Sequence, residues 1–142
     1  MLGYLVVFLG AGVGGAIRHG MNIWVARWLG AHFPYHTFII NILGSFIIGF
    51  FSTMTVAHGR FPAPENLRLF VMVGICGGFT TFSAFSLQTL DLLRAGAPFR
   101  AGVNIVVSVV LCVLSVALGH YIASQINGGT RAIAQVMIEE EG

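Results

Sequence analysis

Four long apolar segments constrain what this chain can fold into more than any other feature of its sequence. They run from about Leu2 to Trp24, Phe33 to Val56, Asn66 to Leu93 and Arg100 to Ser124. A helix needs about 20 mostly apolar residues to cross the hydrocarbon core of a bilayer, and each segment has that length. Of the 142 residues 56% are hydrophobic and only 8% charged, so a soluble fold could not hide the apolar surface that lipid covers readily. The sequence therefore predicts an all-α integral membrane protein with four transmembrane helices.

The four segments are expected to form one domain, residues 1–124, followed by a polar tail, 125–142, that contains three consecutive Glu residues at 139–141. The second connection reads HGRFPAPEN, and its two prolines resist helix formation. The first segment has no Lys or Arg before it and continues past the length of a signal sequence, so we expect it to remain as the first helix.

The basic residues are balanced between the two ends of the predicted bundle. All seven are Arg and they are scattered, which does not favour nucleic-acid binding. One side of the membrane would hold Arg60, Arg68 and Arg131, and the other side Arg27, Arg94 and Arg100. Arg18, the seventh, lies within the first apolar segment and is not counted. Because orientation follows the Lys/Arg excess, three against three favours neither direction. Either the chain inserts both ways and two opposed copies pair as an antiparallel dimer, or the balance is chance in a short protein.

Two apolar segments carry polar residues at every fourth position, which places them on one face of each helix. These are Thr37, Asn41 and Ser45 in the second segment, and Asn104, Ser108 and Cys112 in the fourth. They supply hydroxyl, amide and thiol donors without a carboxylate. One interpretation is hydrogen bonding between packed membrane helices. The other is a polar path across the membrane.

The third segment is expected to break in its middle, where the sequence reads GICGGFTTFSAF over residues 74–85. Gly disfavours helix by about 1 kcal/mol, and Gly77 and Gly78 are followed closely by Thr80 and Thr81. Non-helical backbone at membrane depth is tolerated only inside protein or beside a cavity, and broken helices bind ions in other membrane proteins. The alternative is a kink that serves packing.

Three further residues have two interpretations each. Phe82 and Phe85 share a helix face, and they either fill the core or turn their positive ring edges toward a small anion. Arg18, near the far end of the first segment, either reaches the membrane interface or draws anions into a vestibule.

Taken together, these stretches resemble the Fluc (CrcB) family of small bacterial fluoride channels over nearly the whole chain except the acidic tail. The resemblance is carried by GAGVGGAIRH at residues 10–19, by TFIINILGSFIIG at 37–49 and most strongly by GGFTTFSAFS at 77–86. The order of Gly, Thr, Phe and Ser in the third stretch is unusual within a membrane span, which makes it the most specific of the three.

The resemblance implies a fluoride-selective channel that exports fluoride passively across the bacterial inner membrane. It implies an antiparallel homodimer with two pores, fluoride as the transported ion and a structural sodium ion at the dimer centre. The sodium ion would be held by the backbone carbonyls of Gly77 and Thr80. The residues expected along the fluoride path are Phe82, Phe85, Asn41, Ser108, Cys112, Asn104, Thr37, Ser83 and Arg18.

Two of these residues depart from the family's pattern. Asn104 stands where an aromatic hydroxyl is expected, and Cys112 stands where Ser or Thr is expected.

Three other functions are alternatives to a channel. A small proton-coupled exporter needs a carboxylate inside the membrane, but Glu65, Asp91 and the glutamates of the tail fall at span ends or outside the spans. A membrane enzyme needs a nucleophile paired with a base or a cluster of metal ligands, and neither pattern is present, so no enzyme activity is expected. A non-conducting assembly subunit is the third alternative, which a flux measurement distinguishes from a channel.

Overall fold

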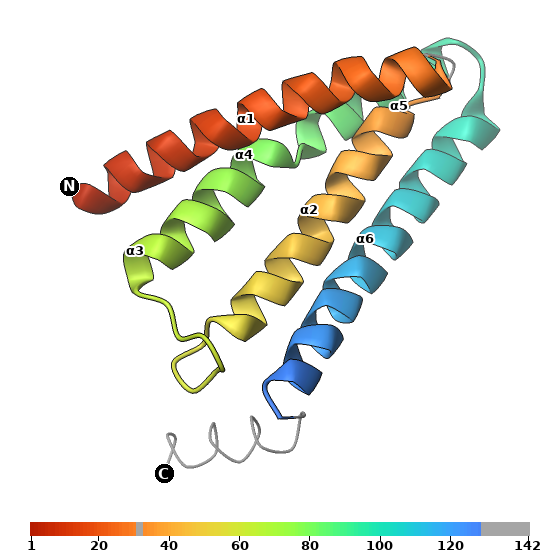
Figure 1. Ribbon diagram of the computed structural model, residues 1–142. Coiled ribbons are helices and arrows are strands. Elements are labelled where there is room, and N and C mark those ends of the chain that lie inside the picture. Colours follow the sequence, from red (N-terminus) through yellow and green to blue (C-terminus); the bar gives the residue numbers. More distant parts are fainter. Residues whose placement is uncertain (31–32, 129–142) are drawn as a thin grey trace.

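The computed structural model describes residues 1–30 and 33–128, and these residues form helices and short connections without a strand. The helices are α1 (Leu2–Leu29), α2 (Tyr35–Met54), α3 (Glu65–Arg68), η1 (Leu69–Cys76), α4 (Gly77–Phe79), α5 (Phe82–Arg94) and α6 (Pro98–Ile126). α3, η1, α4 and α5 follow one another as a single composite span, so four helices are long and apolar enough to cross a membrane (Figure 1). The predicted all-α architecture with four spanning helices is confirmed.

The helices end differently from the predicted segments by a few residues. α1 continues beyond Trp24 to Leu29, and α6 begins at Pro98, which occupies its first turn. Proline suits that place because the first turn of a helix has no intrahelical partner for its N–H groups. The acidic end of the predicted tail lies outside the described residues.

The third span is interrupted at Thr80 and Thr81. α4 ends at Phe79, and the next two residues are extended, Thr80 with ψ 159° and Thr81 with φ −152° and ψ 110°. The predicted break in the middle of the third segment is confirmed, but the glycine pair precedes it, because Gly77 has helical angles of φ −64° and ψ −37° and Gly78 lies inside α4. The break is therefore narrower than the sequence indicated.

Gly78 serves helix packing instead. A Cβ at this position would lie 2.5 Å from the carbonyl oxygen of Ala11 on α1. The same close approach recurs along α1, where a Cβ on Gly10 would lie 2.9 Å from the Cα of Gly74. Small residues allow membrane helices to approach closely enough for backbone atoms to touch. The third span is thereby held against α1 up to the point at which it breaks.

The other main helix pair is α2 with α6, which run side by side for most of their length (Figure 1). Here too glycines stand at the contact, because a Cβ on Gly49 would lie 3.0 Å from the Cα of Val116 and one on Gly119 would lie 2.8 Å from the backbone nitrogen of Phe50. The bundle thus consists of two tightly packed pairs, α1 with the third span and α2 with α6.

Large apolar side chains are exposed along the outer helix faces. Phe8 on α1 is 73% exposed and Val106 on α6 is 61% exposed. Such a continuous apolar exterior is unlike the surface of a soluble monomer, whose apolar patches stay small. Lipid covers these side chains in a membrane-spanning protein.

Candidate functional site

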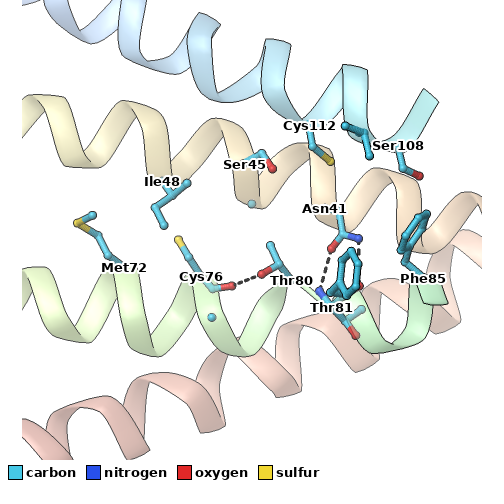
Figure 2. Close-up of a pocket in the computed structure, with 14 residues that line it drawn as sticks. Asn41, Ser45, Ile48, Met72, Cys76, Thr80, Thr81, Phe85, Ser108 and Cys112 are labelled. Atoms are coloured by element: carbon cyan, nitrogen blue, oxygen red, sulfur yellow. Dashed lines mark hydrogen bonds between the residues drawn. The ribbon is translucent and has the colours of Figure 1, made fainter. Parts of the chain in front are cut away.

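A cavity of about 320 Å³ lies between α2, the broken third span and α6, at the level of the break (Figure 2). Its walls are formed by Asn41, Gly44, Ser45, Ile48, Met72, Cys76, Gly77, Thr80, Thr81, Phe82, Phe85, Ser108, Val109 and Cys112. None of these side chains is acidic or basic. The cavity therefore presents apolar surface with hydroxyl, amide and thiol groups and no fixed charge.

Asn41 closes the break in the third span with its side-chain amide. Its Nδ2 donates to the carbonyl oxygen of Thr81 at 3.1 Å, and the backbone N–H of Thr81 donates to its Oδ1 at 2.8 Å (Figure 2). On the other side of the break, the hydroxyl and the N–H of Thr80 donate to the carbonyl oxygen of Cys76 at 2.8 and 2.9 Å. A polar backbone group without a partner is costly at this depth, and these bonds satisfy several such groups.

The break also takes the helical donors away from carbonyls on its N-terminal side, including those of Gly77 and Thr80. In a continuous helix the N–H of Thr81 would bond the carbonyl of Gly77, but it bonds Asn41 instead. The N–H of Ala84 would bond the carbonyl of Thr80, but it donates to Oγ1 of Thr81, which caps α5 at 3.2 Å. Gly77 and Thr80 were predicted from the family resemblance to hold a cation, and their carbonyl oxygens are among those that lose their helical donors at the break.

The two phenylalanines at the start of α5 differ in their surroundings. Both line the cavity, but Phe85 is only 8% exposed, whereas Phe82 is 77% exposed. Their ring centroids are 5.3 Å apart with the ring planes at 47°. In such a tilted pair the two rings present edges in different directions, and ring edges carry partial positive charge.

Serine and cysteine side chains complete the polar part of the cavity wall. Ser45 comes from α2, and Ser108 and Cys112 come from successive turns of α6 (Figure 2). Cys76 also lines the cavity, and both cysteines are free thiols. The structure thus brings together residues from the two predicted polar stripes and from the break.

Four of the predicted path residues do not line this cavity. Thr37 is buried on α2 and is 4% exposed, and Asn104 is 1% exposed and donates to the hydroxyl of Thr89 rather than into the cavity. Ser83 is exposed near the start of α5, and Arg18 lies on α1, away from the cavity wall.

Several cavity residues were missed by sequence reasoning. Ile48, Met72 and Val109 carry no signal that distinguishes them from other apolar residues of a membrane span. Thr81 did carry one, because Thr is a favoured N-cap residue and stands directly before α5. Gly44 became recognisable only in three dimensions, because a Cβ at this position would collide with the side chain of Thr80.

Comparison with known proteins adds independent findings. Residues 5–120 match the family described as CrcB-like protein, Camphor Resistance (CrcB). A fluoride-specific ion channel FluC of Methylobacterium radiotolerans is 55% identical over 138 residues, which cover 97% of this chain and 96% of the relative. The protein of the same name from Methylocella silvestris is 55% identical over 87% of this chain and 95% of the relative, and that from Gluconobacter oxydans is 51% identical over 96% and 95%.

Proposed function

This chain belongs to the CrcB family, and from this premise we propose that it is a fluoride-selective channel through which fluoride leaves the cell passively. The observation that carries the proposal is the uncharged cavity, which joins Asn41, Ser108 and Cys112 to the two phenylalanines of the break region. The relatives named fluoride-specific ion channels align over nearly the full chain, so the alignments include the four membrane-spanning segments.

The chemistry of the cavity suits a small anion. Amide, hydroxyl and thiol groups donate hydrogen bonds, and ring edges add partial positive charge without a full counter-charge that would trap the ion. A cation would find no carboxylate on the cavity wall. Conduction requires binding that is favourable enough to enter and weak enough to leave, which neutral donors provide. No chemical step is needed, so the function is transport and not catalysis.

The conducting form in this proposal is an antiparallel homodimer with two pores in the bacterial inner membrane. The exposure of Phe82 supports this, because a ring that is 77% exposed in one protomer would gain a protein environment from a second copy. Gly77, at the same cavity, is also exposed, and a Cβ there would meet no atom within 4 Å, so the position leaves room for a second copy. A second copy placed there would bring both breaks close to a two-fold axis.

A sodium ion at that axis is the proposed structural cofactor. The carbonyl oxygens of Gly77 and Thr80 fit this role, because both have lost their helical donors and neutral carbonyl oxygens are suitable ligands for a hard monovalent cation. Two copies would supply four such oxygens. Replacing all sodium and potassium by a large organic cation should weaken the dimer or its flux, and unchanged dimerisation and flux in that solution would argue against the ion.

Fluoride efflux from loaded liposomes tests the function itself. Purified protein should release fluoride rapidly and chloride hardly at all, both followed with ion-selective electrodes, and empty liposomes provide the baseline. Equal rates for the two anions would exclude a fluoride-selective channel. Absence of any flux would favour a non-conducting assembly subunit.

A further inference from the structure

A buried polar contact joins α5 to α6 next to the cavity. Asn104 on α6 is 1% exposed, and its Nδ2 donates to the hydroxyl oxygen of Thr89 on α5 at 2.8 Å. The same hydroxyl donates to the carbonyl oxygen of Phe85 at 2.8 Å. The two bonds form a chain from the α6 side chain, through Thr89, to the backbone of a residue that lines the cavity.

Both residues of this hydrogen-bonded pair lie one helical turn away from a residue that lines the cavity. Thr89 lies one helical turn after Phe85, and Asn104 lies one turn before Ser108. α5 and α6 are consecutive helices joined by residues 95–97 and pack against each other, so they run in opposite directions. The hydrogen bond between Thr89 and Asn104 therefore connects α5 to α6 one turn away from the place where Phe85 and Ser108 line the cavity, and we call this connection the rung.

α5 depends on such contacts more than an ordinary helix does. It starts after the extended residues Thr80 and Thr81, so a continuous helix does not fix its direction. Its start is held to α2 by the bonds between Asn41 and Thr81, and its middle by a 3.1 Å hydrogen bond between Gln88 and His36. The bond from Asn104 is the corresponding attachment to α6.

We propose that Asn104 and Thr89 are positioning residues that set the separation between Phe85 and Ser108 across the cavity. Asn104 acts through α5 and does not contact the permeating ion, because its amide is buried and already bonded to Thr89. This inference rests on the proposed fluoride channel for its functional consequence, whereas the rung itself is a property of the fold. A small change in the separation matters because an ion of fixed size must reach donors on both walls.

The direct test removes either end of the rung. Thr89→Val replaces the hydroxyl by a methyl group of nearly the same size, and Asn104→Leu removes the amide at similar volume. Each change should lower fluoride efflux from liposomes by about tenfold, because loss of one buried hydrogen bond reduces the population of correctly placed α5 by about that factor. The double variant should lose no more than either single one, because both delete the same contact.

Two matched variants separate positioning from general damage. Thr89→Ser keeps the hydroxyl and should retain most of the flux. Ser124→Ala removes a hydroxyl from an equally buried residue of α6 that bonds only its own helix, to the carbonyl of Tyr121 at 2.8 Å, and should leave the flux unchanged. If Asn104→Leu fails to fold, Thr89→Val carries the test alone.

A readout that does not require conduction distinguishes this inference from the proposed function. A fluorinated phenylalanine at position 85 should give one sharp fluorine NMR signal in the parent protein and a shifted or broadened signal in Thr89→Val and Asn104→Leu, but not in Ser124→Ala. If the parent protein conducts no fluoride, the proposed function fails and the spectrum still tests the rung. Unchanged spectra and normal flux in Thr89→Val and Asn104→Leu would overturn the inference, as would an equal loss in Ser124→Ala.

Discussion

Asn41 shows how one side chain acquires a role that its position in a polar stripe does not reveal. Sequence reasoning treated it as a donor along a path, and the structure uses both its donor and its acceptor to bond the backbone of Thr81. It also lines the cavity. Its amide therefore substitutes for a peptide group at the place where the third span has lost its own hydrogen bonds.

Removing that amide should affect stability as well as flux. Asn41→Ala would leave the N–H and the carbonyl of Thr81 without these bonds, at a cost of about 1–3 kcal/mol in the free energy of unfolding. We expect a lower thermal midpoint in detergent together with reduced fluoride efflux. Ser52→Ala is the control on the same helix, because its hydroxyl bonds only the carbonyl of Gly49. Full flux and an unchanged midpoint in Asn41→Ala would contradict the bridging role.

The phenylalanine pair leads to a second prediction at the scale of single residues. Phe82→Ile and Phe85→Ile keep apolar bulk but remove the ring edge that a small anion can approach. Each should lose most of the fluoride efflux while the protein elutes at the same volume as the parent protein in size-exclusion chromatography. Phe8→Ile, at a residue of α1 that is 73% exposed on the outer surface, should conduct normally. Normal flux in both Ile variants would mean that the rings serve packing only.

At the scale of helices, the glycines of α1 decide how closely the third span can approach. A Cβ on Gly14 would lie 2.9 Å from the backbone nitrogen of Phe79, whereas a Cβ on Gly12 would meet no atom within 4 Å. Membrane helices associate through such close packing and not through a hydrophobic driving force between them. α1 and the third span are therefore held together by shape at the level of the break.

These two glycines give a matched experiment on helix packing. Gly14→Ala forces the backbones of α1 and the third span apart and should destabilise the protein by about 1–3 kcal/mol. Gly12→Ala should be neutral or slightly stabilising, because Ala favours helix over Gly by about 1 kcal/mol. Thermal unfolding in detergent measures both. Equal midpoints for the two variants would show that the close approach contributes little to stability.

At the scale of the whole molecule, the connections gather at two ends of the bundle. The first and third connections lie at one end, and the second lies at the other (Figure 1). Arg68 at the second end bonds the carbonyl of Ser52 at 3.2 Å and the hydroxyl of Thr55 at 2.6 Å, so it also ties α2 to the third span. From the Arg balance in the sequence we expect an unbiased orientation, which pairing of two opposed copies would require.

Mixed orientation in the cell membrane is the prediction that follows from this balance. A cysteine at exposed Gln125 should react with an impermeant maleimide from both sides of the membrane, with the parent chain as the background for Cys76 and Cys112. Labelling from one side alone would exclude dual insertion.

Charge added to the second connection should then disturb this balance. Ala57→Lys with Pro62→Lys, both at exposed positions, should make labelling one-sided and lower fluoride efflux. Gln at the same two positions is the uncharged control and should leave both properties unchanged. If the lysine variant keeps two-sided labelling and full efflux, orientation does not follow the Arg balance.

The family expected from GGFTTFSAFS and the two shorter stretches is confirmed by the match over residues 5–120, and the four spanning helices are confirmed as well. The antiparallel dimer, the sodium ion and the roles of the individual path residues remain predictions.

Within the site, the polar stripes indicated Asn41, Ser108 and Cys112 because a helical period of about 3.6 residues assigns faces reliably. The same period could not indicate that Asn104 turns toward α5 and that its amide is bonded there.

What the sequence determined by itself is therefore local or additive: membrane insertion, the number of spans, the helical faces and the family. Hydropathy and periodicity act along one segment, and they carry that information without any knowledge of the neighbours. Only the tertiary structure decided that the break falls at Thr80 and Thr81, that Asn41 closes it and that Asn104 reaches Thr89. The physical reason is that each of these depends on which side chain of another helix supplies a hydrogen-bond partner, and that choice is made only when the helices pack.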